Sequence, residues 1–232
     1  MIRVAVVGAG GLGGPITLGL VHAGFEVTVF DGDTVDISNL HRQLQFCDAD
    51  LGRNKAMALR DWAGATHAHA SHWVADNADD VCGDVDLIVD ASDSAATKFA
   101  VNDWATRTGR PFVIAAALGV AGSVMLGAPS FACYRCWFEA PPGEADSCAD
   151  AGVLGPILGQ VAAIAVDGAT ALARGDRRTA GTLWTCADLS IEPHHVRQRP
   201  LAARADCPAC RTSPMPPGQI PLLLAKAHHA SH

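Results

Sequence analysis

The sequence has little charge and few aromatic side chains. Charged residues make up 18% of the 232 residues and aromatic residues 6%, with a single tyrosine. No Lys/Arg run of useful length is present and the formal net charge is −7, which argues against nucleic acid as the main partner. Hydrophobic residues nevertheless make up 49% of the chain, which excludes a disordered class and predicts one large domain, with or without an appendage.

Long uninterrupted apolar runs are also missing. The sequence contains no stretch of about 18 to 20 apolar residues, the length that a membrane-spanning helix needs. The apolar run in MIRVAVVGAGG breaks at glycine after a few residues, so no signal peptide is expected. We therefore expect a cytoplasmic protein without membrane contact.

Cysteine, in contrast, is plentiful, with eight residues. Without a signal peptide, metal binding or chemistry explains them better than disulfides do. Two C-x-x-C pairs, CYRC and CPAC, match a tetrahedral four-thiolate zinc site, which would be structural because no coordination position stays open. The predicted zinc ligands are Cys133, Cys136, Cys207 and Cys210. Four unrelated buried cysteines are one alternative. A thioredoxin-like redox pair is a weaker one, because neither pair is expected to begin a helix after a strand.

The N-terminal segment predicts a nucleotide-binding βαβ unit. Residues 4–7 (VAVV) form a short β-branched strand that enters GAGGLGG, and residues 27–30 (VTVF) form a second strand. The helix between them is expected to end near Gly24. The glycine segment fits G-x-G-x-x-G, where the backbone can approach phosphate oxygens at a helix N-terminus. Asp31 follows at the spacing of a ribose-binding acid. The pattern indicates a nucleotide and leaves NAD, FAD and ATP open.

The segment DGDTVDISNLHRQ, residues 31–43, contains groups that a dinucleotide-binding fold does not need. Arg42 can hold phosphate oxygens with a planar fork of N–H groups, and Asn39 and Gln43 can hydrogen-bond phosphate or sugar. Lys55 opens a predicted helix. A lone cation is as readily a solvated surface charge, but two near one nucleotide indicate a triphosphate whose charge is offset while a bond at phosphorus breaks.

Two carboxylates close a predicted strand in DLIVDASDS. Ligands of open α/β sheets bind at this end of the strands, and Mg²⁺ prefers one or two carboxylates together with phosphate oxygens. We predict Asp93 as the magnesium ligand, with Asp90 in support. Capping of the following helix by Asp93 is the alternative.

The rest of the chain predicts further strands and helices. Helices are expected at 54–63, 96–108 and 156–175, and strands around 67–74, 86–90, 111–118, 122–128, Leu183 and Ile191. Cys148 lies in a segment rich in Pro, Gly and acidic residues that is expected to be a loop. It could act as a nucleophile or have no chemical role, and its acidic neighbours would raise the pKa of its thiol.

The motif order resembles a known family. GAGGLG, DGDTVDISNLHRQ, Lys55, DASD, C-x-x-C, CADAGVLGP and C-x-x-C are similar, from about residue 1 to 212, to the ubiquitin-activating-enzyme-like adenylyltransferases. Members of the ThiF/MoeB/HesA type activate sulfur-carrier proteins. The resemblance implies an α/β fold with a Rossmann-like, mostly parallel sheet extended to a mixed sheet, usually in a homodimer. Residues 1–130 would bind the nucleotide, 131–212 would bind zinc and the carrier within the same domain, and 213–232 would be a Pro-rich tail.

The resemblance also implies a reaction and the residues that perform it. The C-terminal glycine carboxylate of a small ubiquitin-like carrier attacks the α-phosphate of ATP, which leaves an acyl-adenylate for sulfur transfer; ATP, Mg²⁺ and Zn²⁺ are required. The implied nucleotide-binding set is Gly8, Gly10, Gly11, Gly13, Asp31, Asp33, Asn39, Arg42, Gln43, Lys55 and Asp93. The implied catalytic set is Arg42, Lys55, Asp93 and Cys148, the last matching a loop cysteine that some relatives use covalently.

Three features depart from the family's usual pattern. An N-terminal RYxRQ arginine, which reaches the partner subunit's ATP, is expected to be missing or to come from elsewhere. Ser94 follows Asp93 where the family often has asparagine. No sulfur-donor domain follows, so a separate donor is expected. Three alternatives stay open: adenylation of a peptide or small-molecule carboxylate in natural-product biosynthesis, a nicotinamide-dependent oxidoreductase, and a non-catalytic binding subunit.

Overall fold

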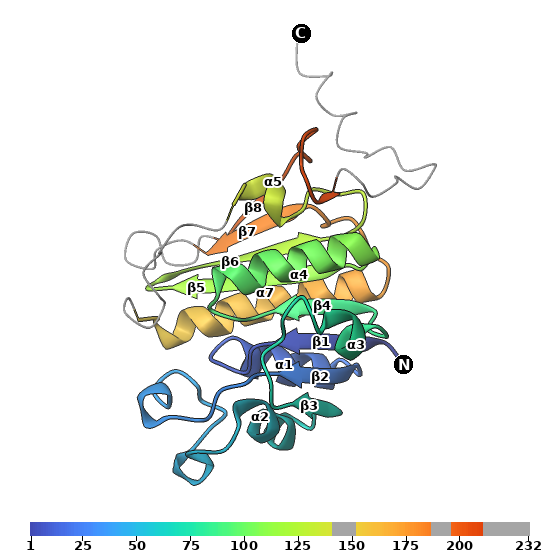
Figure 1. Ribbon diagram of the computed structural model, residues 1–232. Coiled ribbons are helices and arrows are strands. Elements are labelled where there is room, and N and C mark those ends of the chain that lie inside the picture. The colour runs from blue at the N-terminus through green and yellow to red at the C-terminus, as the bar shows by residue number, and fades with distance from the viewer. Residues whose placement is uncertain (141–151, 187–195, 211–232) are drawn as a thin grey trace.

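A single twisted sheet runs through the protein. The computed structural model describes residues 1–140, 152–186 and 196–210. The strands are β1 (Arg3–Val7), β2 (Glu26–Phe30), β3 (His67–His69), β4 (Leu87–Asp90), β5 (Phe112–Leu118), β6 (Ala121–Gly127), β7 (Thr182–Cys186) and β8 (Val196–Pro200). They form one sheet in the order β3-β2-β1-β4-β5-β6-β7-β8 (Figure 1). The first five strands in this order, β3, β2, β1, β4 and β5, are parallel to one another. Strands β6, β7 and β8 each run antiparallel to the preceding strand. The predicted α/β fold with a mixed sheet is confirmed.

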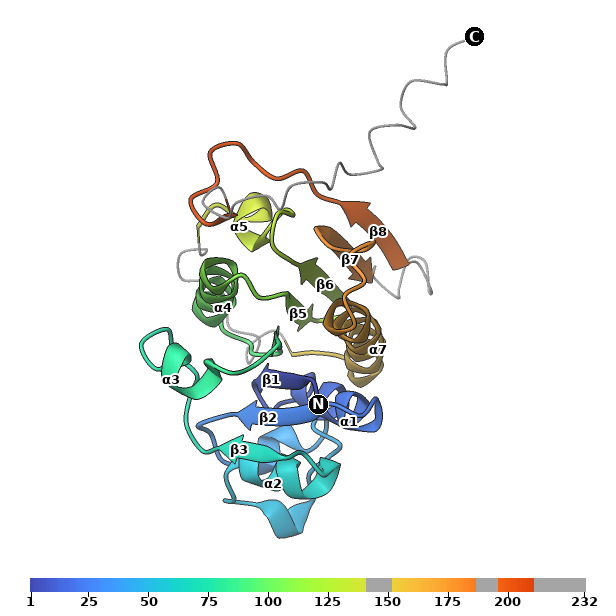
Figure 2. The ribbon, with the colours of Figure 1, turned by 90° about the vertical axis from the view of Figure 1, so that its right-hand side faces the viewer.

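Helices cover both faces of the sheet. They are α1 (Gly13–His22), α2 (Lys55–Ala63), α3 (Ala78–Cys82), α4 (Ala95–Thr108), α5 (Tyr134–Trp137) and α7 (Gly155–Ala173), with 3-10 turns at Ile37–Asn39 and Asp48–Asp50. Helices α1, α2 and α7 pack on one face, and α3, α4 and α5 on the other (Figure 2). Alternate residues of β1 face the two resulting cores, with Val4 and Val6 on one side and Ala5 and Val7 on the other.

Helix α7 owes its apolar character to this packing. Its length and composition alone would allow it to cross a membrane, but a helix in the core of a globular protein often has the same length and composition. In this helix, 44% of the most apolar stretch is buried inside the protein. Gly168 lets the helix approach the sheet, since a Cβ there would lie 2.4 Å from Leu126. A Cβ on Gly122 of β6 would likewise lie 2.2 Å from Val161 of α7. The apolar face of α7 therefore fits closely against β6.

The helix ends follow the local sequence. Asn54 and Ser94 cap α2 and α4 by accepting the N–H groups of Met57 and Thr97. Glycines close both helices in the left-handed conformation, with φ of 72° at Gly64 and 69° at Gly109. The expected stop of α4 at Gly109 is confirmed.

Several expected elements differ in extent. The strand expected at 67–74 is only three residues long in β3. Ile191 lies outside the described residues, and the last described strand begins at Val196. Helix α3 has five residues, too few for a helical period to show in the sequence. Helix α5 begins directly after Cys133, but it does not directly follow a strand, because β6 ends at Gly127.

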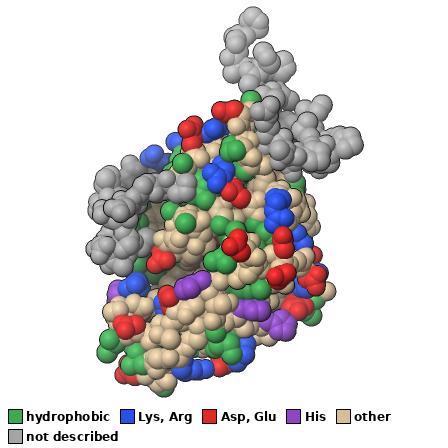
Figure 3. Space-filling model, viewed as in Figure 1, with side chains coloured by type: hydrophobic (Ala, Val, Ile, Leu, Met, Phe, Trp, Pro, Cys, Tyr) green, Lys and Arg blue, Asp and Glu red, His purple; other side chains and the backbone are tan. Residues whose placement is uncertain are grey.

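Surface charge is mixed on the face that Figure 3 shows. Lys and Arg side chains are scattered there among Asp and Glu side chains, with apolar side chains between them (Figure 3). This view gives no single-sign patch that would draw in a charged macromolecule.

Candidate nucleotide site and cysteine cluster

The carboxyl ends of the parallel strands open onto a cavity of about 1010 Å³. It lies where β1 is flanked by β2 on one side and β4 on the other, the switch point at which open α/β sheets bind ligands. All but one of the predicted nucleotide-binding residues line it: Gly8, Gly10, Gly11, Asp31, Asp33, Asn39, Arg42, Gln43, Lys55 and Asp93. The structure thus brings together groups that are spread from Gly8 to Asp93 in the sequence.

At two positions of the glycine turn, Gly8 and Gly13, another part of the backbone lies too close to leave room for a side chain. Gly8 has φ of 96°, and a Cβ on it would lie 3.0 Å from the backbone of Ala91 and Ser92. A Cβ on Gly13 would lie 1.9 Å from the Gly8 carbonyl oxygen. Gly13 therefore lets α1 pack under the turn rather than lining the cavity. No side chain caps α1 at Leu12, and the N–H groups of Gly14 and Ile16 in its first turn already donate to Gly10 O (3.0 Å) and Leu12 O (3.2 Å). Phosphate oxygens would therefore meet the N–H groups of the turn that precedes the helix.

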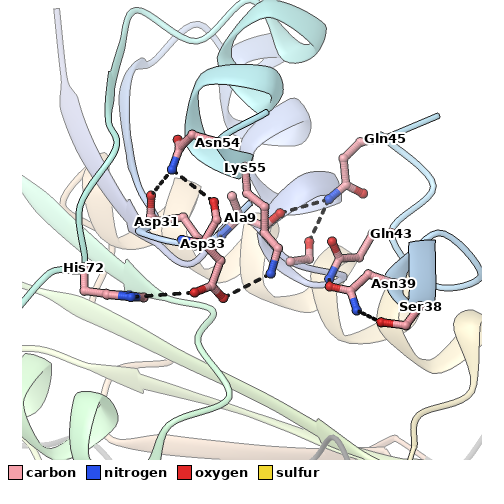
Figure 4. A network of polar contacts seen from close by, with 11 residues as sticks. Ala9, Asp31, Asp33, Ser38, Asn39, Gln43, Gln45, Asn54, Lys55 and His72 are labelled. Atoms are coloured by element: carbon pink, nitrogen blue, oxygen red, sulfur yellow. Dashed lines mark hydrogen bonds and ion pairs between the residues drawn. The ribbon is translucent and has the colours of Figure 1, made fainter. Parts of the chain in front are cut away.

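Gln45 holds the turn in place and was not predicted from the sequence. Its Nε2 donates to the carbonyl oxygens of Ala9 (3.0 Å) and Gly10 (2.9 Å), as Figure 4 shows. The side chain is buried. A second glutamine in a polar segment gives no sequence signal of this contact, because the contact joins positions more than thirty residues apart.

Asp31 directly follows β2 and lines the cavity. Its carboxylate accepts the N–H groups of Ala9 (2.7 Å) and Asp33 (2.8 Å). Burial raises the pKa of Asp31, while these two hydrogen bonds and the charge of Lys55 act in the opposite direction. The carboxylate is therefore fixed at the place where the sequence predicts contact with a ribose.

Lys55 reaches the same region from the first residue of α2. Its Nζ lies 3.1 Å from Asp33 Oδ2, and His72 Nε2 lies 3.6 Å from Asp33 Oδ1 (Figure 4). The Lys55 side chain is only 10% exposed. Asp31, Asp33 and His72 are close enough to share a cation. However, Lys55 and backbone N–H groups already use much of the carboxylate oxygen surface.

The second cation, Arg42, also lines the cavity. Within the described part of the chain, Arg42 forms no ion pair, and its Nη1 donates weakly to Ser38 O at 3.3 Å. Asn39 and Gln43 are joined to each other through Gln43 Nε2 and Asn39 Oδ1 at 3.3 Å. Gln43 Oε1 is buried without a hydrogen-bond partner among the described residues. A guanidinium without a counter-ion and an unsatisfied buried amide both point to a polar ligand in the cavity.

Asp93 lines the cavity with an exposed carboxylate. The helix-capping alternative is wrong, because the cap of α4 is Ser94, whose hydroxyl accepts the Thr97 N–H at 3.2 Å. Serine and asparagine are both good caps, so the departure from the family's asparagine leaves the helix start intact. Asp93 is accordingly available to a metal ion or a nucleotide.

Asp90 has a different role from the supporting magnesium ligand that we expected. It is fully buried, and Lys98 Nζ lies 2.7 Å from its Oδ2. The same ammonium donates to Ser92 O (2.7 Å) and Ala115 O (2.8 Å), which satisfies all three of its N–H groups. Burial raises the pKa of Asp90 and the charge of Lys98 opposes that shift. The ion pair fixes the loop between β4 and α4, just before Asp93.

The four paired cysteines converge outside this cavity. Their sulfur atoms lie within 4.8 Å of one another, with Cys133 3.5 Å from Cys207, Cys136 3.5 Å from Cys210, and Cys133 4.0 Å from Cys136. A tetrahedral zinc with bonds of about 2.3 Å separates its sulfur ligands by roughly 3.8 Å. The cluster therefore fits a zinc ion, and the alternative of four unrelated cysteines is wrong.

The electrostatics of the cluster also call for a cation. Burial and the neighbouring sulfur charges raise the pKa of Cys133 to about 12 and raise that of Cys210 as well. Burial has the same tendency at Cys207, but N–H groups of Cys210 and Ala209 bring the pKa of Cys207 down to about 7. Four thiolates at these distances repel one another unless a metal offsets their charge.

Two predicted features lie outside the described residues. They are Cys148 and the tail at 213–232. The segment after residue 151 returns to the cavity, where Gly119 N donates to Gly152 O (3.0 Å) and Leu154 N donates to Gly119 O (2.8 Å). Val153 and Leu158 line the cavity from this side.

Comparisons with known proteins agree with this geometry. The adenylyltransferase and sulfurtransferase uba4 of Emericella nidulans is 38% identical over 178 residues, covering 68% of this chain and 36% of that protein. The adenylyltransferase and sulfurtransferase MOCS3 of Culex quinquefasciatus is 34% identical over 225 residues, covering 91% of this chain and 50% of that protein. The chain thus spans about a third to a half of these relatives, whose names agree with the expected adenylyltransferase enzyme.

Solved structures share the fold. Escherichia coli MccB with ATP aligns with a TM-score of 0.75 at 18% identity, over 90% of this chain and 67% of that one. The microcin C7 biosynthetic enzyme MccB with N-formylated MccA aligns with a TM-score of 0.76 at 17% identity, over 90% and 67%. The ThiF family matches residues 1–209, and this chain belongs to that family.

Proposed function

We propose that this protein is an ATP-dependent adenylyltransferase that activates the C-terminal glycine carboxylate of a small ubiquitin-like sulfur-carrier protein. The observation that supports this most directly is the single cavity that unites the glycine turn with Asp31, Arg42, Lys55 and Asp93. The names of the relatives at 34% to 38% identity support the same chemistry. A nicotinamide-dependent oxidoreductase would leave Arg42 and Lys55 without a role.

In this proposal the nucleotide lies across the glycine turn. Backbone N–H groups at Gly10 and Gly11 approach its phosphates, with Gly8 providing the turn. Asp31 accepts hydrogen bonds from the ribose hydroxyls, and its fixed position lowers the entropic cost of holding them. Asn39 and Gln43 donate their amide N–H groups to the phosphates, and Gln43 Oε1 accepts a hydroxyl of the sugar, which gives this buried oxygen the donor that it lacks among the described residues.

The chemical step is an in-line displacement at phosphorus. A carboxylate oxygen of the acceptor attacks the α-phosphorus, and the bond from that phosphorus to the bridging oxygen of the β-phosphate breaks. Pyrophosphate leaves with the bond electrons and the acyl-adenylate stays in the cavity. Arg42 and Lys55 offset the charge on the departing phosphates, so Lys55 turns from Asp33 toward the nucleotide. Mg²⁺, when bound, would neutralise charge on the phosphates, and Asp93 is the residue that would hold it.

The acceptor would enter from the opposite wall of the cavity. That wall is lined by small side chains and backbone from β5 and β6, including Ala116, Ala117, Gly122 and Ser123. Little side-chain volume there leaves room for an extended chain end next to the phosphates. A glycine terminus fits such a wall better than a bulky one does.

Other parts of the chain complete the proposal. The four cysteines would hold a structural Zn²⁺. The Cys148 thiol would attack the acyl carbon of the adenylate in a later step, forming a thioester while its proton and AMP leave, and a separate protein would donate sulfur. A homodimer and a cytoplasmic setting belong to the same proposal, as does the assignment of 131–212 to carrier binding.

Isotope exchange between pyrophosphate and ATP tests the proposal. We expect exchange only when a carrier ending in Gly-Gly is present, with short peptides as the comparison substrates. Asp93→Ala should abolish exchange while the protein stays folded, and Lys55→Ala should reduce exchange by roughly 100-fold. Arg53→Ala, which removes a nearby cation paired with Asp50 and Asp61 on the surface, is the matched control and should keep full exchange.

The alternatives give different results in the same set of experiments. Exchange with peptides but not with carriers would replace the carrier as substrate. Binding of NAD without binding of ATP would favour an oxidoreductase. If the unsubstituted chain binds ATP but shows no exchange with any acceptor, and the Asp93→Ala variant gives the same result, the protein would be a non-catalytic subunit.

A further inference from the structure

The first cysteine pair is fastened to the middle of helix α4. Asn102, which is fully buried, accepts the Tyr134 N–H through its Oδ1 at 2.7 Å. Arg135 donates to both carboxylate oxygens of Asp103, at 2.7 Å each. The Arg135 guanidinium also lies 4.9 Å from the centre of the Phe99 ring, and the Tyr134 ring meets that ring edge-on at 5.1 Å. The two residues between the paired cysteines therefore bind α4 through polar and aromatic contacts.

The N-terminal end of the same helix is fastened to the nucleotide cavity. Lys98, next to Phe99, donates to Asp90, to Ser92 O and to Ala115 O. These contacts fix the loop that carries Asp93 and join it to β5. Helix α4 thus connects the cysteine cluster with the loop of the predicted magnesium ligand, although no residue that lines the cavity belongs to the cluster.

Ligands at the two sites would therefore act on the same helix, α4. A zinc ion would fix the positions of Cys133 and Cys136 and, through Arg135, the placement of α4. The Lys98 contacts hold this loop as far as Ser92, and a magnesium nucleotide would hold the exposed Asp93 that follows, at the other end of that helix. When two ligands order the same element, the second to bind meets a smaller ordering cost, and each strengthens the binding of the other by an equal factor.

We propose that helix α4 couples zinc binding at the cysteine cluster to nucleotide binding in the cavity, with Arg135 and Asp103 as the positioning pair. The proposal rests on the proposed function for the identity of the nucleotide. It assigns the cluster a part in nucleotide affinity beyond holding the C-terminal segment.

The test uses the full chain loaded with zinc. Zinc affinity is measured by competition with a chelator of known affinity, with and without saturating ATP and Mg²⁺. We expect zinc to bind at least about fivefold more tightly when the nucleotide is present. Hydrogen exchange of α4 is measured on the same samples and should slow when either ligand binds.

Two variants locate the coupling. Asp103→Asn keeps all four cysteines but weakens the Arg135 contact, and should reduce the nucleotide effect on zinc affinity to less than about twofold. Asp79→Asn is the matched control, because Asp79 pairs with Arg107 nearer the C-terminal end of α4, at 2.9 Å. This control should keep the full effect.

The results separate this proposal from the proposed function. Equal zinc affinity with and without ATP, in a protein that binds ATP, would overturn the coupling and leave the adenylyltransferase proposal intact. Failure of the zinc-loaded protein to bind ATP would refute the proposed function itself. An Asp103→Asn variant with undiminished coupling would remove the positioning pair. If that variant does not fold, the measurement on the unsubstituted chain decides.

Discussion

The nucleotide end and the cysteine end of the sheet are built in different ways. At the nucleotide end, the cavity takes shape from the glycine turn, two side-chain caps and hydrogen bonds such as those of Gln45 and Asp31. At the cysteine end, the sulfur atoms that meet come from residues 74 positions apart. One site is preformed by backbone geometry, whereas the other brings together groups that repel one another without a metal.

Burial follows the same division. The strands around the cavity are almost entirely buried, but all five residues of the edge strand β8 are exposed. Apolar burial therefore contributes little to holding β8 and the segment after it. The comparison implies that apolar packing stabilises the buried strands of the sheet, whereas β8 and the segment after it depend on the ligand of the cysteine cluster.

Removal of one zinc-binding thiolate should have the largest effect of the changes considered, and it should affect the cysteine end of the sheet more than the nucleotide end. Cys207→Ser takes away a fully buried ligand, and we expect loss of bound zinc together with more than about 5 kcal/mol of stability. Zinc content and urea unfolding measure both effects. Hydrogen exchange should rise in β7 and β8 and change little in β1 and β2. Cys47→Ser, at an exposed cysteine, is the control. Uniform loss of protection over the whole sheet would show that the two ends do not differ in this way.

The buried ion pair at the nucleotide end should give the next largest effect. Lys98→Met leaves the fully buried Asp90 without its counter-ion, which costs about 3 to 5 kcal/mol in urea unfolding. The double variant Asp90→Asn with Lys98→Met should recover part of that loss, because no buried charge remains. Arg107→Met, which breaks an exposed ion pair on the same helix, should cost less than about 1 kcal/mol. Equal losses for Lys98→Met and Arg107→Met would contradict the assignment of a buried network.

The two ends also differ in how far the sequence predicts them. The glycine turn, Asp31, Arg42 and Lys55 could be identified because a strand, a tight turn and a helix place them through local geometry. The cysteine cluster could be identified because thiolate pairs have few other uses in such a chain. Both predictions rest on residues whose chemistry is unusual at their positions.

The sequence could not predict the polar contacts that support these residues. Gln45, Lys98 and Asn102 resemble surface residues in the sequence, and only the packed sheet shows that each is buried against a distant backbone group. Asp93 and Ser94 are equally suitable helix caps, so the sequence alone could not choose between them. Tertiary placement decides such cases, because the partner of a buried polar group lies far away along the chain.

The smallest expected effect is a pH dependence of ligand affinity at the nucleotide end, which depends on Asp31. Burial raises the pKa of Asp31 above 3.8, and the hydrogen bonds from Ala9 and Asp33 only partly oppose it. In the ligand-free protein, the stability that this shift contributes is complete below pH 3.8 and is lost as the pH rises through the folded pKa. Binding of ribose hydroxyls needs the ionised form, so affinity should change in the opposite direction and rise over the same pH range.

Adenosine is the suitable ligand for this titration, because it lacks phosphates that titrate near neutrality. We expect its affinity, measured by calorimetry, to rise as the pH is raised from the acid range to pH 7. Asp31→Asn should bind adenosine more weakly and with a flat profile. Asp36→Asn, at an exposed carboxylate whose pKa is lowered by its hydrogen bonds to Ser38, should keep the slope of the unsubstituted chain. A slope that survives in Asp31→Asn would place the titrating group elsewhere in the cavity and would remove the ribose contact from Asp31.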